Sequence, residues 1–574
     1  MTAPTLPYSL LLLCVIVPGI IQAQDLAQIG KAKPFSYSGN LSSRFVFYDA
    51  SGIPVRRDPF GYVLSGSATV GVYDFTLPFS FTFTNQGTSY GQPFNQFGAS
   101  PTYKWATLHL GYRNINYSSY TLAGHQMLGA GVELNPGKLR FGFMYGRMRR
   151  AVQFRPQPDS LSLDTLLQTQ KIPVGEDPVY QRTGWGTKIG YGDDKGFVDL
   201  ILFKAADDPS SIDDDSIKQI FRPAQNAVIG INARRTFFNK LSVFFEGAIS
   251  AYTRDSELED EGEAGDSVSQ SKLFRPFLPI NSTTYYYRAF RFGAGYSRSN
   301  FNVQTDYQRI DSDYKSMGAY FFNNDVESFN VMPSVYLFRN KAIITSGVSY
   351  MHDNLNNKKQ STTHRLIPRI NLSINPTYKF GVDVGYQDMF TDQTSGVLEI
   401  TDSTRMRMSN PGFTLGFRYN IADTLRTHNF MIMGNQFSMK DKNPVTQPFS
   451  EYTATILNFN YSLFFLKKNI GVNVSITTNS LESFTGTVTS TGTSVGINKS
   501  FMDSKLNISA SWSANFSEAG DSQSANAGVQ YTPKGRFSFS TQLNYLLAEQ
   551  GATTFNEFTG YLEARYSFAQ KKKP

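Results

Sequence analysis

The stretch Ile470-Gly-Val-Asn-Val-Ser-Ile-Thr-Thr478 alternates strictly between apolar and small or polar residues. Ile470, Val472, Val474 and Ile476 fall on one side of the alternation, and glycine, asparagine, serine and threonine fall on the other. Because successive side chains of a β-strand point to opposite faces of its sheet, this stretch predicts a strand with one apolar and one polar face.

The same alternation recurs along the chain, for example in residues 241–254, 536–547 and 558–568. Strands of about 9 to 11 residues are what a tilted strand needs to cross a bilayer, whereas strands of soluble sandwiches are nearer 5 or 6 residues. No linker or shift in composition divides the chain after the first 23 residues. We therefore predict an all-β protein in which residues 24–568 form one large antiparallel transmembrane β-barrel, closed because lipid tolerates no free strand edge.

The composition supports this class of protein. Aromatic residues make up 14% of the 574 residues and charged residues 17%, below the roughly 25% of soluble domains. The mean hydropathy of −0.31 disfavours a bundle of membrane helices, and the 40% of hydrophobic residues disfavours disorder. The formal net charge of +8 is spread over turns and strands without a basic stripe, so we expect no nucleic-acid partner.

The first 23 residues are expected to be a signal peptide. Leu10 to Val17 is an apolar run too short to span a bilayer, and Ala23 provides a small residue before a cleavage site at Gln24. Cys14, the single cysteine, lies inside this run, so the mature chain has no thiol for a disulfide or a thiolate metal site.

Turn lengths alternate in the way expected of an outer-membrane barrel. Short Asn/Asp/Gly/Pro turns such as 135–138 and 503–505 alternate with longer polar segments, namely 155–180, 209–225, 256–282, 311–325 and 390–408. Since periplasmic turns are short and external loops long, the short turns should face the periplasm.

The strand count depends on the N-terminal region. Counting between turns gives about 22 strands from Trp105 to Phe568, and 35–48, 62–75 and 77–86 also have strand character. Antiparallel closure needs an even number, so segment 87–104 either hides a further strand, for about 26, or part of 24–104 forms a plug in a barrel of about 22 to 24 strands. We favour about 26.

Segment 87–104 also has to connect strands 77–86 and 105–117, which point the same way. Pro93 and Pro101 argue against a strand through its middle. We therefore expect it to cross the lumen, although a short hidden strand is the alternative.

The chain resembles outer-membrane β-barrel proteins of the Bacteroidota type. The resemblance rests on Ala23-Gln24 at the cleavage site, the alternating strands, and the aromatic end Tyr561-Leu-Glu-Ala-Arg-Tyr-Ser-Phe568. It implies a location in the outer membrane and recognition by the barrel-assembly machinery during insertion. Residues 569–574 depart from the pattern by adding a basic tail, which should be periplasmic.

Parity within the strands assigns side chains to faces. Phe245, Phe459, Phe539 and Leu562 are expected to face lipid. The lumen-facing candidates are Glu246, Arg254, Arg536, Gln542, Glu563 and Arg565. In strand 138–154, Arg147 and Arg149 share a face with Phe143 and Tyr145, and are candidates for contact with lipopolysaccharide phosphates.

We find no sequence signal for catalysis. The five histidines form no close metal-ligand pair, so we expect no enzymatic activity, no cofactor and no metal. Acidic clusters at 207–215 and 255–266 lack the spacing of an EF-hand and are interpreted as solvated loops. The predicted function is a channel or transport protein for polar solutes; the alternative is a structural barrel that partners a surface or secretion complex.

Overall fold

The structure of the protein is a computed structural model. It describes residues 35–570, except 86–94, 157–174, 177, 260–267, 320–322, 519, 534 and 552. The predicted signal peptide and the lysines of the C-terminal tail lie outside the described residues.

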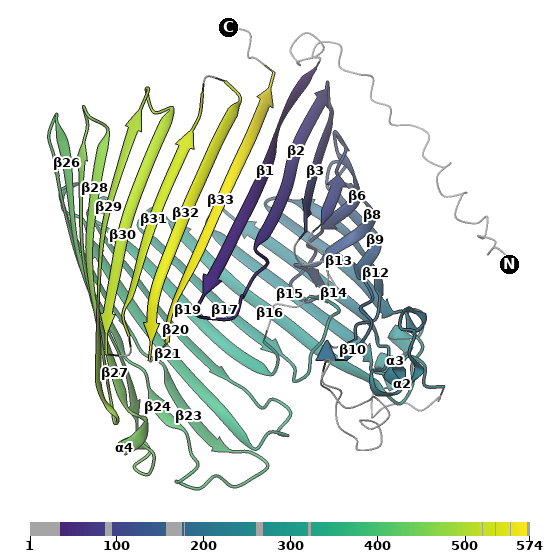
Figure 1. Ribbon diagram of the computed structural model, residues 1–574. Coiled ribbons are helices and arrows are strands. Elements are labelled where there is room, and N and C mark those ends of the chain that lie inside the picture. Colours follow the sequence, from purple (N-terminus) through teal and green to yellow (C-terminus); the bar gives the residue numbers. More distant parts are fainter. Residues whose placement is uncertain are drawn as a thin grey trace.

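One antiparallel sheet forms the wall of the molecule (Figure 1). Its N-terminal part comprises β1 (Ser36–Ser51), β2 (Phe60–Val72), β3 (Phe75–Thr84), β4 (Gln96–Ala99), β5 (Thr102–Tyr103), β6 (Ala106–Asn114), β8 (Gln126–Leu134), β9 (Leu139–Arg149), β12 (Arg182–Asp193), β13 (Gly196–Asp207), β14 (Gln225–Phe237) and β15 (Leu241–Thr253). Its middle part comprises β16 (Thr284–Arg298), β17 (Phe301–Ile310), β19 (Val326–Leu337), β20 (Ala342–His352), β21 (Ser361–Ile374), β22 (Phe380–Gln387), β23 (Phe390–Ser395), β24 (Arg407–Ser409) and β25 (Gly412–Ala422). Its C-terminal part comprises β26 (Arg426–Asp441), β27 (Tyr452–Phe465), β28 (Ile470–Ser483), β29 (Gly486–Phe501), β30 (Leu506–Ser517), β31 (Ser522–Tyr531), β32 (Phe537–Gln550) and β33 (Thr553–Ala569).

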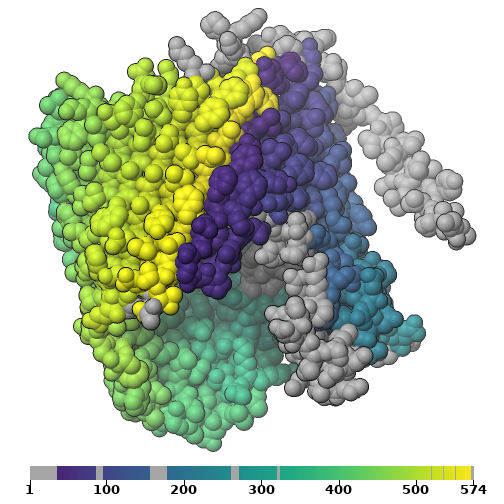
Figure 2. Space-filling model, in the orientation of Figure 1, coloured from purple at the N-terminus to yellow at the C-terminus, as the bar shows by residue number. Residues whose placement is uncertain are grey.

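The sheet closes on itself. The first strand, β1, pairs antiparallel with the last, β33, from Ser38↔Ala569 to Ser51↔Asn556. In Figure 2 the yellow surface of β33 lies directly against the purple surface of β1. Three positions in the wall are each shared by two short strands, namely β4 with β5, β22 with β23, and β24 with β25. Counted by wall position, the barrel has 26 strands, as predicted.

The fourth wall position is the hidden strand of segment 87–104. Both β4 and β5 pair with β3 on one side and β6 on the other, in a single register. Residues 96–103 therefore lie in the wall, and the expectation that they cross the lumen is wrong; residues 87–94 lie outside the described residues.

Prolines explain why this strand is interrupted. The Ser100 amide donates to the Pro78 carbonyl at 3.0 Å, but Pro78 has no N–H with which to return the bond. The Thr102 hydroxyl donates to the Ser100 carbonyl at 3.2 Å instead. The prolines thus remove ladder bonds without ending the strand, which is why the sequence pattern is weak here.

The two faces of the wall differ in polarity. Large apolar side chains point outward and are exposed, including Phe245, Phe459, Phe539 and Leu562, as expected from parity. Residues of opposite parity point inward and are mostly hydroxyls, amides, glycines and paired charges. An apolar outside around a polar inside is the pattern of a barrel that sits in lipid.

The two ends of the barrel also differ (Figure 1). The end at which β33 finishes has tight turns throughout, and we call it the short-turn end. The opposite, long-loop end carries β10 (Arg155–Pro156), β11 (Gly175–Glu176), a 3₁₀ turn at Pro209–Ser211, α2 (Asp215–Ile220), α3 (Val268–Phe274) and α4 (Gln447–Ser450). Segment 390–408, expected to be a loop, instead contributes β23 and most of β24, which extend the wall at this end.

No helix in the described ranges is long and apolar enough to cross a membrane.

Candidate functional site in the barrel interior

Two connections at the long-loop end fold inward instead of projecting outward. The first inner segment, residues 115–125, joins β6 to β8 and contains β7 (Leu122–Ala123). The second, residues 311–319, follows β17 and contains β18 (Gly318–Ala319). Strands β7 and β18 pair in parallel, Leu122↔Gly318 and Ala123↔Ala319, so the inner segments support each other.

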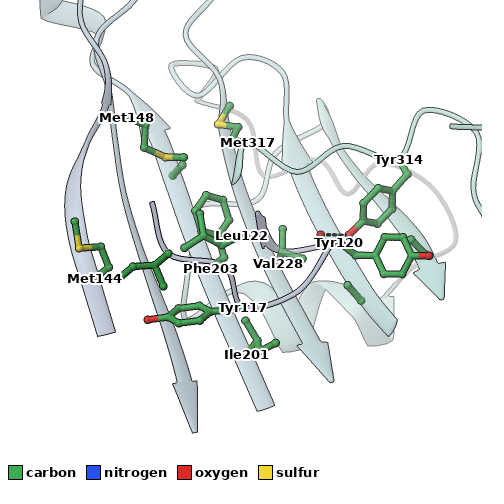
Figure 3. Packing of buried hydrophobic residues seen from close by; sticks show 14 of the residues in the cluster. Tyr117, Tyr120, Leu122, Met144, Met148, Ile201, Phe203, Val228, Tyr314 and Met317 are labelled. Carbon is green, nitrogen blue, oxygen red and sulfur yellow. Dashed lines mark hydrogen bonds between the residues drawn. The ribbon is translucent and has the colours of Figure 1, made fainter. Parts of the chain in front are cut away.

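The inner segments pack on the inner face of β8 to β17. Figure 3 shows Tyr117, Tyr120 and Leu122 of the first segment and Tyr314 and Met317 of the second among side chains of the wall. These wall side chains include Met144, Met148, Ile201, Phe203 and Val228. Leu122 is 0% exposed and Tyr314 1% exposed, so this part of the interior is a close-packed core.

Glycines of the wall make room for the inner segments. A Cβ atom at Gly142 would lie 2.8 Å from the Tyr117 hydroxyl oxygen, and one at Gly230 would lie 2.5 Å from Cγ2 of Thr121. Larger residues at these positions would push the segments away from the wall, because a packed interior has no spare volume.

Hydrogen bonds fix the segments to the wall. The Tyr314 hydroxyl donates to the Tyr120 carbonyl at 2.7 Å, and the Ser316 hydroxyl donates to the Thr121 carbonyl at 2.6 Å. The carboxamide oxygen of Asn226 on β14 accepts the Met317 amide at 2.9 Å. Buried hydrogen bonds of this kind favour one conformation, so these bonds make the segments a fixed element of the interior.

Glu246, a lumen-facing candidate, contacts the first inner segment. Its carboxylate on β15 accepts the backbone amide of Ser119 at 2.5 Å. The side chain therefore points to the polar face of the wall and helps to hold the segment.

Asp325 anchors the far end of the second connection. Its carboxylate accepts hydrogen bonds from the Ser312 hydroxyl at 2.6 Å and the Leu355 amide at 2.8 Å, and forms an ion pair with Lys359. Burial opposes ionisation of Asp325, but these donors and the Asn354 amide outweigh it, so the pKa of this carboxyl falls to about 2.

We expect Asp325→Asn to lower the free energy of local unfolding of the loop around Leu355 by about 2 kcal/mol at neutral pH. A carboxyl with a lowered pKa stabilises the fold above its ordinary pKa near 4, and this contribution is lost as the pH falls toward 2. The protection factors of the Asn354 and Leu355 amides, that is, their exchange rates relative to the intrinsic rate at each pH, should therefore fall over that window in the parent and be low at all pH values in the variant. Glu399→Gln, at an exposed carboxylate of the same end, is the control; equal protection in both variants would contradict the role of Asp325.

Charges on the inner face are paired near the inner segments. Arg140 on β9 donates to both carboxylate oxygens of Asp199 on β13, at 2.8 and 3.0 Å. Arg291 on β16 is paired with Asp306 on β17 in the same way, at 3.1 and 3.2 Å. These pairs leave little net charge on this part of the wall.

The predicted residues of β33 meet at the closing seam. Glu563 accepts Arg44 of β1 at 2.5 Å, Ser42 at 2.9 Å and Arg565 at 3.2 Å. The guanidinium of Arg44 also lies over the Tyr561 ring, 4.9 Å from its centroid. Glu563 and Arg565 thus join the first strand to the last on the polar face.

Two other lumen-facing candidates lie just outside the strands. Arg536 precedes β32 and donates to the Tyr566 hydroxyl at 3.3 Å, and Tyr566 packs on exposed Phe537 of the outer face. Its lumen assignment is therefore wrong, because a residue outside the strand does not follow strand parity. Arg254 lies just beyond the end of β15, exposed, with its amide donating to the Thr283 carbonyl at 3.1 Å.

A bulge separates the two lipopolysaccharide candidates. The pairing of β9 with β12 shifts by one residue between Thr183↔Arg147 and Arg182↔Arg149. A one-residue shift moves a side chain to the other face, and Arg149 donates to Asp207 at 3.2 Å. The shared outward face predicted for Arg147 and Arg149 is thus wrong for Arg149, while Arg147 keeps the parity of exposed Tyr145.

The opposite side of the interior, the wall formed by β28 to β32, has no cover among the described residues. We call it the bare wall. A cavity of about 760 Å³ lies against it, and a second of about 240 Å³ follows toward the long-loop end. Gln542, predicted to face the lumen, lines the larger cavity. Amides and hydroxyls dominate this lining, including Asn473, Asn498, Asn507, Ser509, Ser511, Asn526, Gln530 and Gln542.

Within the described ranges, no group of three or more His, Cys, Asp or Glu residues could hold a metal ion.

Comparison with known proteins identifies no family. No protein-family model matches the chain, and no curated protein matches it. Among solved structures, the translocation pore of the P pilus usher PapC is 11% identical, covers 94% of this chain and 100% of its own, and superposes with a TM-score of 0.37. The ferric enterobactin receptor PfeA of Pseudomonas aeruginosa, in complex with enterobactin, is 10% identical over 92% of this chain and 81% of its own, with a TM-score of 0.41. The anion-selective porin of Comamonas acidovorans is 7% identical over 49% of this chain and 93% of its own, with a TM-score of 0.24.

Proposed function

We propose that this protein is a channel for polar solutes in the bacterial outer membrane, with the short-turn end in the periplasm. The observation that carries the proposal is the uneven interior. The inner segments cover one side of the lumen, while the bare wall borders cavities lined by polar groups. A wide barrel with an interior cover on one side only leaves space for water and solutes beside it.

Three narrower predictions accompany this proposal. Arg147 is proposed to contact lipopolysaccharide phosphates, the barrel-assembly machinery is proposed to insert the chain, and the Bacteroidota-type origin stays a prediction from sequence resemblance. The signal peptide and the periplasmic basic tail likewise stay predictions.

We expect the purified, refolded protein to give steady ohmic current in a planar lipid bilayer. Replacing residues 116–124 by a short Gly-Ser linker should raise the single-channel conductance, because it removes the cover from β8 to β17. A Gly-Ser replacement of 398–404, which lies between β23 and β24 at the rim, is the matched control and should leave the conductance nearly unchanged.

Absence of current from parent and linker variant alike, in protein shown to be folded, would contradict the channel. It would favour the alternative of a structural barrel that partners a surface or secretion complex.

A further inference from the structure

The inner face of the bare wall is free of charge. Lys499, which borders the larger cavity, alternates with the inward-facing Asn498 and Ser500 and lies over the Phe501 ring, 4.6 Å from its centroid. Every inward-facing side chain described in β28 to β32 is an amide, a hydroxyl, a glycine or a small or apolar residue, with no Asp, Glu, Lys or Arg among them. This contrasts with the covered side, where carboxylates and guanidinium groups form ion pairs. A neutral wall offers no partner to a charged solute, which would lose hydration there without compensation, so the wall favours uncharged solutes.

The amides of the wall have unused hydrogen-bonding capacity. Among the described residues, the side chains of Asn473, Asn498, Asn526, Gln530 and Gln542 make no hydrogen bond with protein. Elsewhere on the same wall, serine hydroxyls hydrogen-bond to each other. Their oxygen atoms lie 2.6 Å apart in Ser475 and Ser494 and 2.8 Å apart in Ser513 and Ser524. Each carboxamide offers two donors and one acceptor oxygen, which matches groups that both donate and accept.

Two exposed aromatic rings stand at the long-loop end beside the bare wall. Phe449 of α4 and Phe484 of the β28–β29 turn are 67% and 63% exposed, and their ring centroids lie 6.0 Å apart. The connection at Phe484 is a tight turn, so no long loop from these two strands overhangs the rings. Two adjoining exposed aromatic rings at this end offer a surface on which an apolar ring face can pack.

These observations together favour one class of solute. We propose that the bare wall binds a neutral, hydroxyl-rich chain, that is, an uncharged glycan, whose sugar faces first contact Phe449 and Phe484. Sugar hydroxyls donate and accept as the free carboxamides require, and the apolar face of a pyranose ring packs on an aromatic ring. A polypeptide of ordinary composition carries charges for which the wall holds no partner. This inference deepens the proposed channel function. Transport of the glycan rests on that function, whereas binding of the glycan to the wall does not.

Titration calorimetry of the detergent-solubilised, full-length barrel with a neutral dextran oligosaccharide tests the proposal. We expect saturable binding that weakens about tenfold or more in the triple variant Asn473→Ala, Asn498→Ala, Asn526→Ala, since each lost hydrogen bond weakens binding several-fold. Phe449→Ala with Phe484→Ala should also weaken it. The matched control is Asn302→Ala with Gln304→Ala, which removes amides from the inner face of β17 and should leave binding unchanged.

The outcomes separate the two proposals. Dextran binding without bilayer current would sustain the glycan site and overturn the channel. Current without dextran binding would sustain the channel and overturn the glycan site. Equal binding of dextran sulfate, tighter binding of a neutral glycine-serine peptide, or an equal loss in the β17 control would each overturn the glycan assignment.

Discussion

Arginine at Leu543 is expected to destabilise the barrel by about 2–4 kcal/mol, whereas arginine at the adjacent Gln542 should cost far less. Leu543 lies in the middle of β32, points outward and is 44% exposed, so its replacement would place a charge near the centre of the lipid layer. Gln542 lines the inner cavity, where a charge stays in water. Chemical unfolding from lipid vesicles measures both variants.

Phe539 provides a depth control for this experiment. It also points outward, but it lies two residues after the start of β32 at the short-turn end. Arginine there should cost only about 0–1 kcal/mol, because the penalty falls toward the membrane interface. Equal costs at positions 542 and 543 would contradict the assignment of the two faces.

The second large effect is expected at Asp207, where alanine should destabilise the barrel by about 3–5 kcal/mol. The Asp207 side chain is 5% exposed and accepts Arg182 at 2.8 and 3.0 Å and Arg149 at 3.2 Å. Removing it leaves the buried Arg182 guanidinium without its bidentate partner. Thermal or chemical unfolding in detergent gives the change.

A double variant distinguishes a lost ion pair from a general packing defect. Arg182→Met combined with Asp207→Leu removes both charges and keeps apolar volume, so it should recover most of the stability lost in Asp207→Ala. A loss below about 1 kcal/mol in the single variant would show that the network contributes little.

The wall of the barrel was predictable because its physical signal is local. Alternation of apolar and polar residues, as in Ile470 to Thr478, indicates a strand with one apolar and one polar face. Closure required an even strand count, which either a strand in segment 87–104 or an N-terminal plug could satisfy. Pro101 weakens the strand pattern there, so the sequence led us to expect a path across the lumen instead of a wall strand.

The interior was not predictable in the same way, because it depends on contacts between distant residues. Tyr117 to Leu122 has the composition of an ordinary loop, and only its packing against β9, β13 and β14 places it inside. Wall glycines such as Gly142 and Gly230 were a usable signal, since each leaves space that a side chain from elsewhere must fill. The face on which Arg149 lies could not be predicted, because the alternation of the sequence does not reveal a one-residue bulge.

The pairing of β1 with β33 has a consequence for the biogenesis of the protein. The Ser42–Glu563 contact joins residues 521 positions apart, so the ring cannot shut until the C-terminal strand has been made and exported. Until then the nascent sheet has two unpaired margins, each of which could recruit strands of another chain. A chain truncated before residue 553 would therefore keep both margins unpaired and would be prone to aggregation.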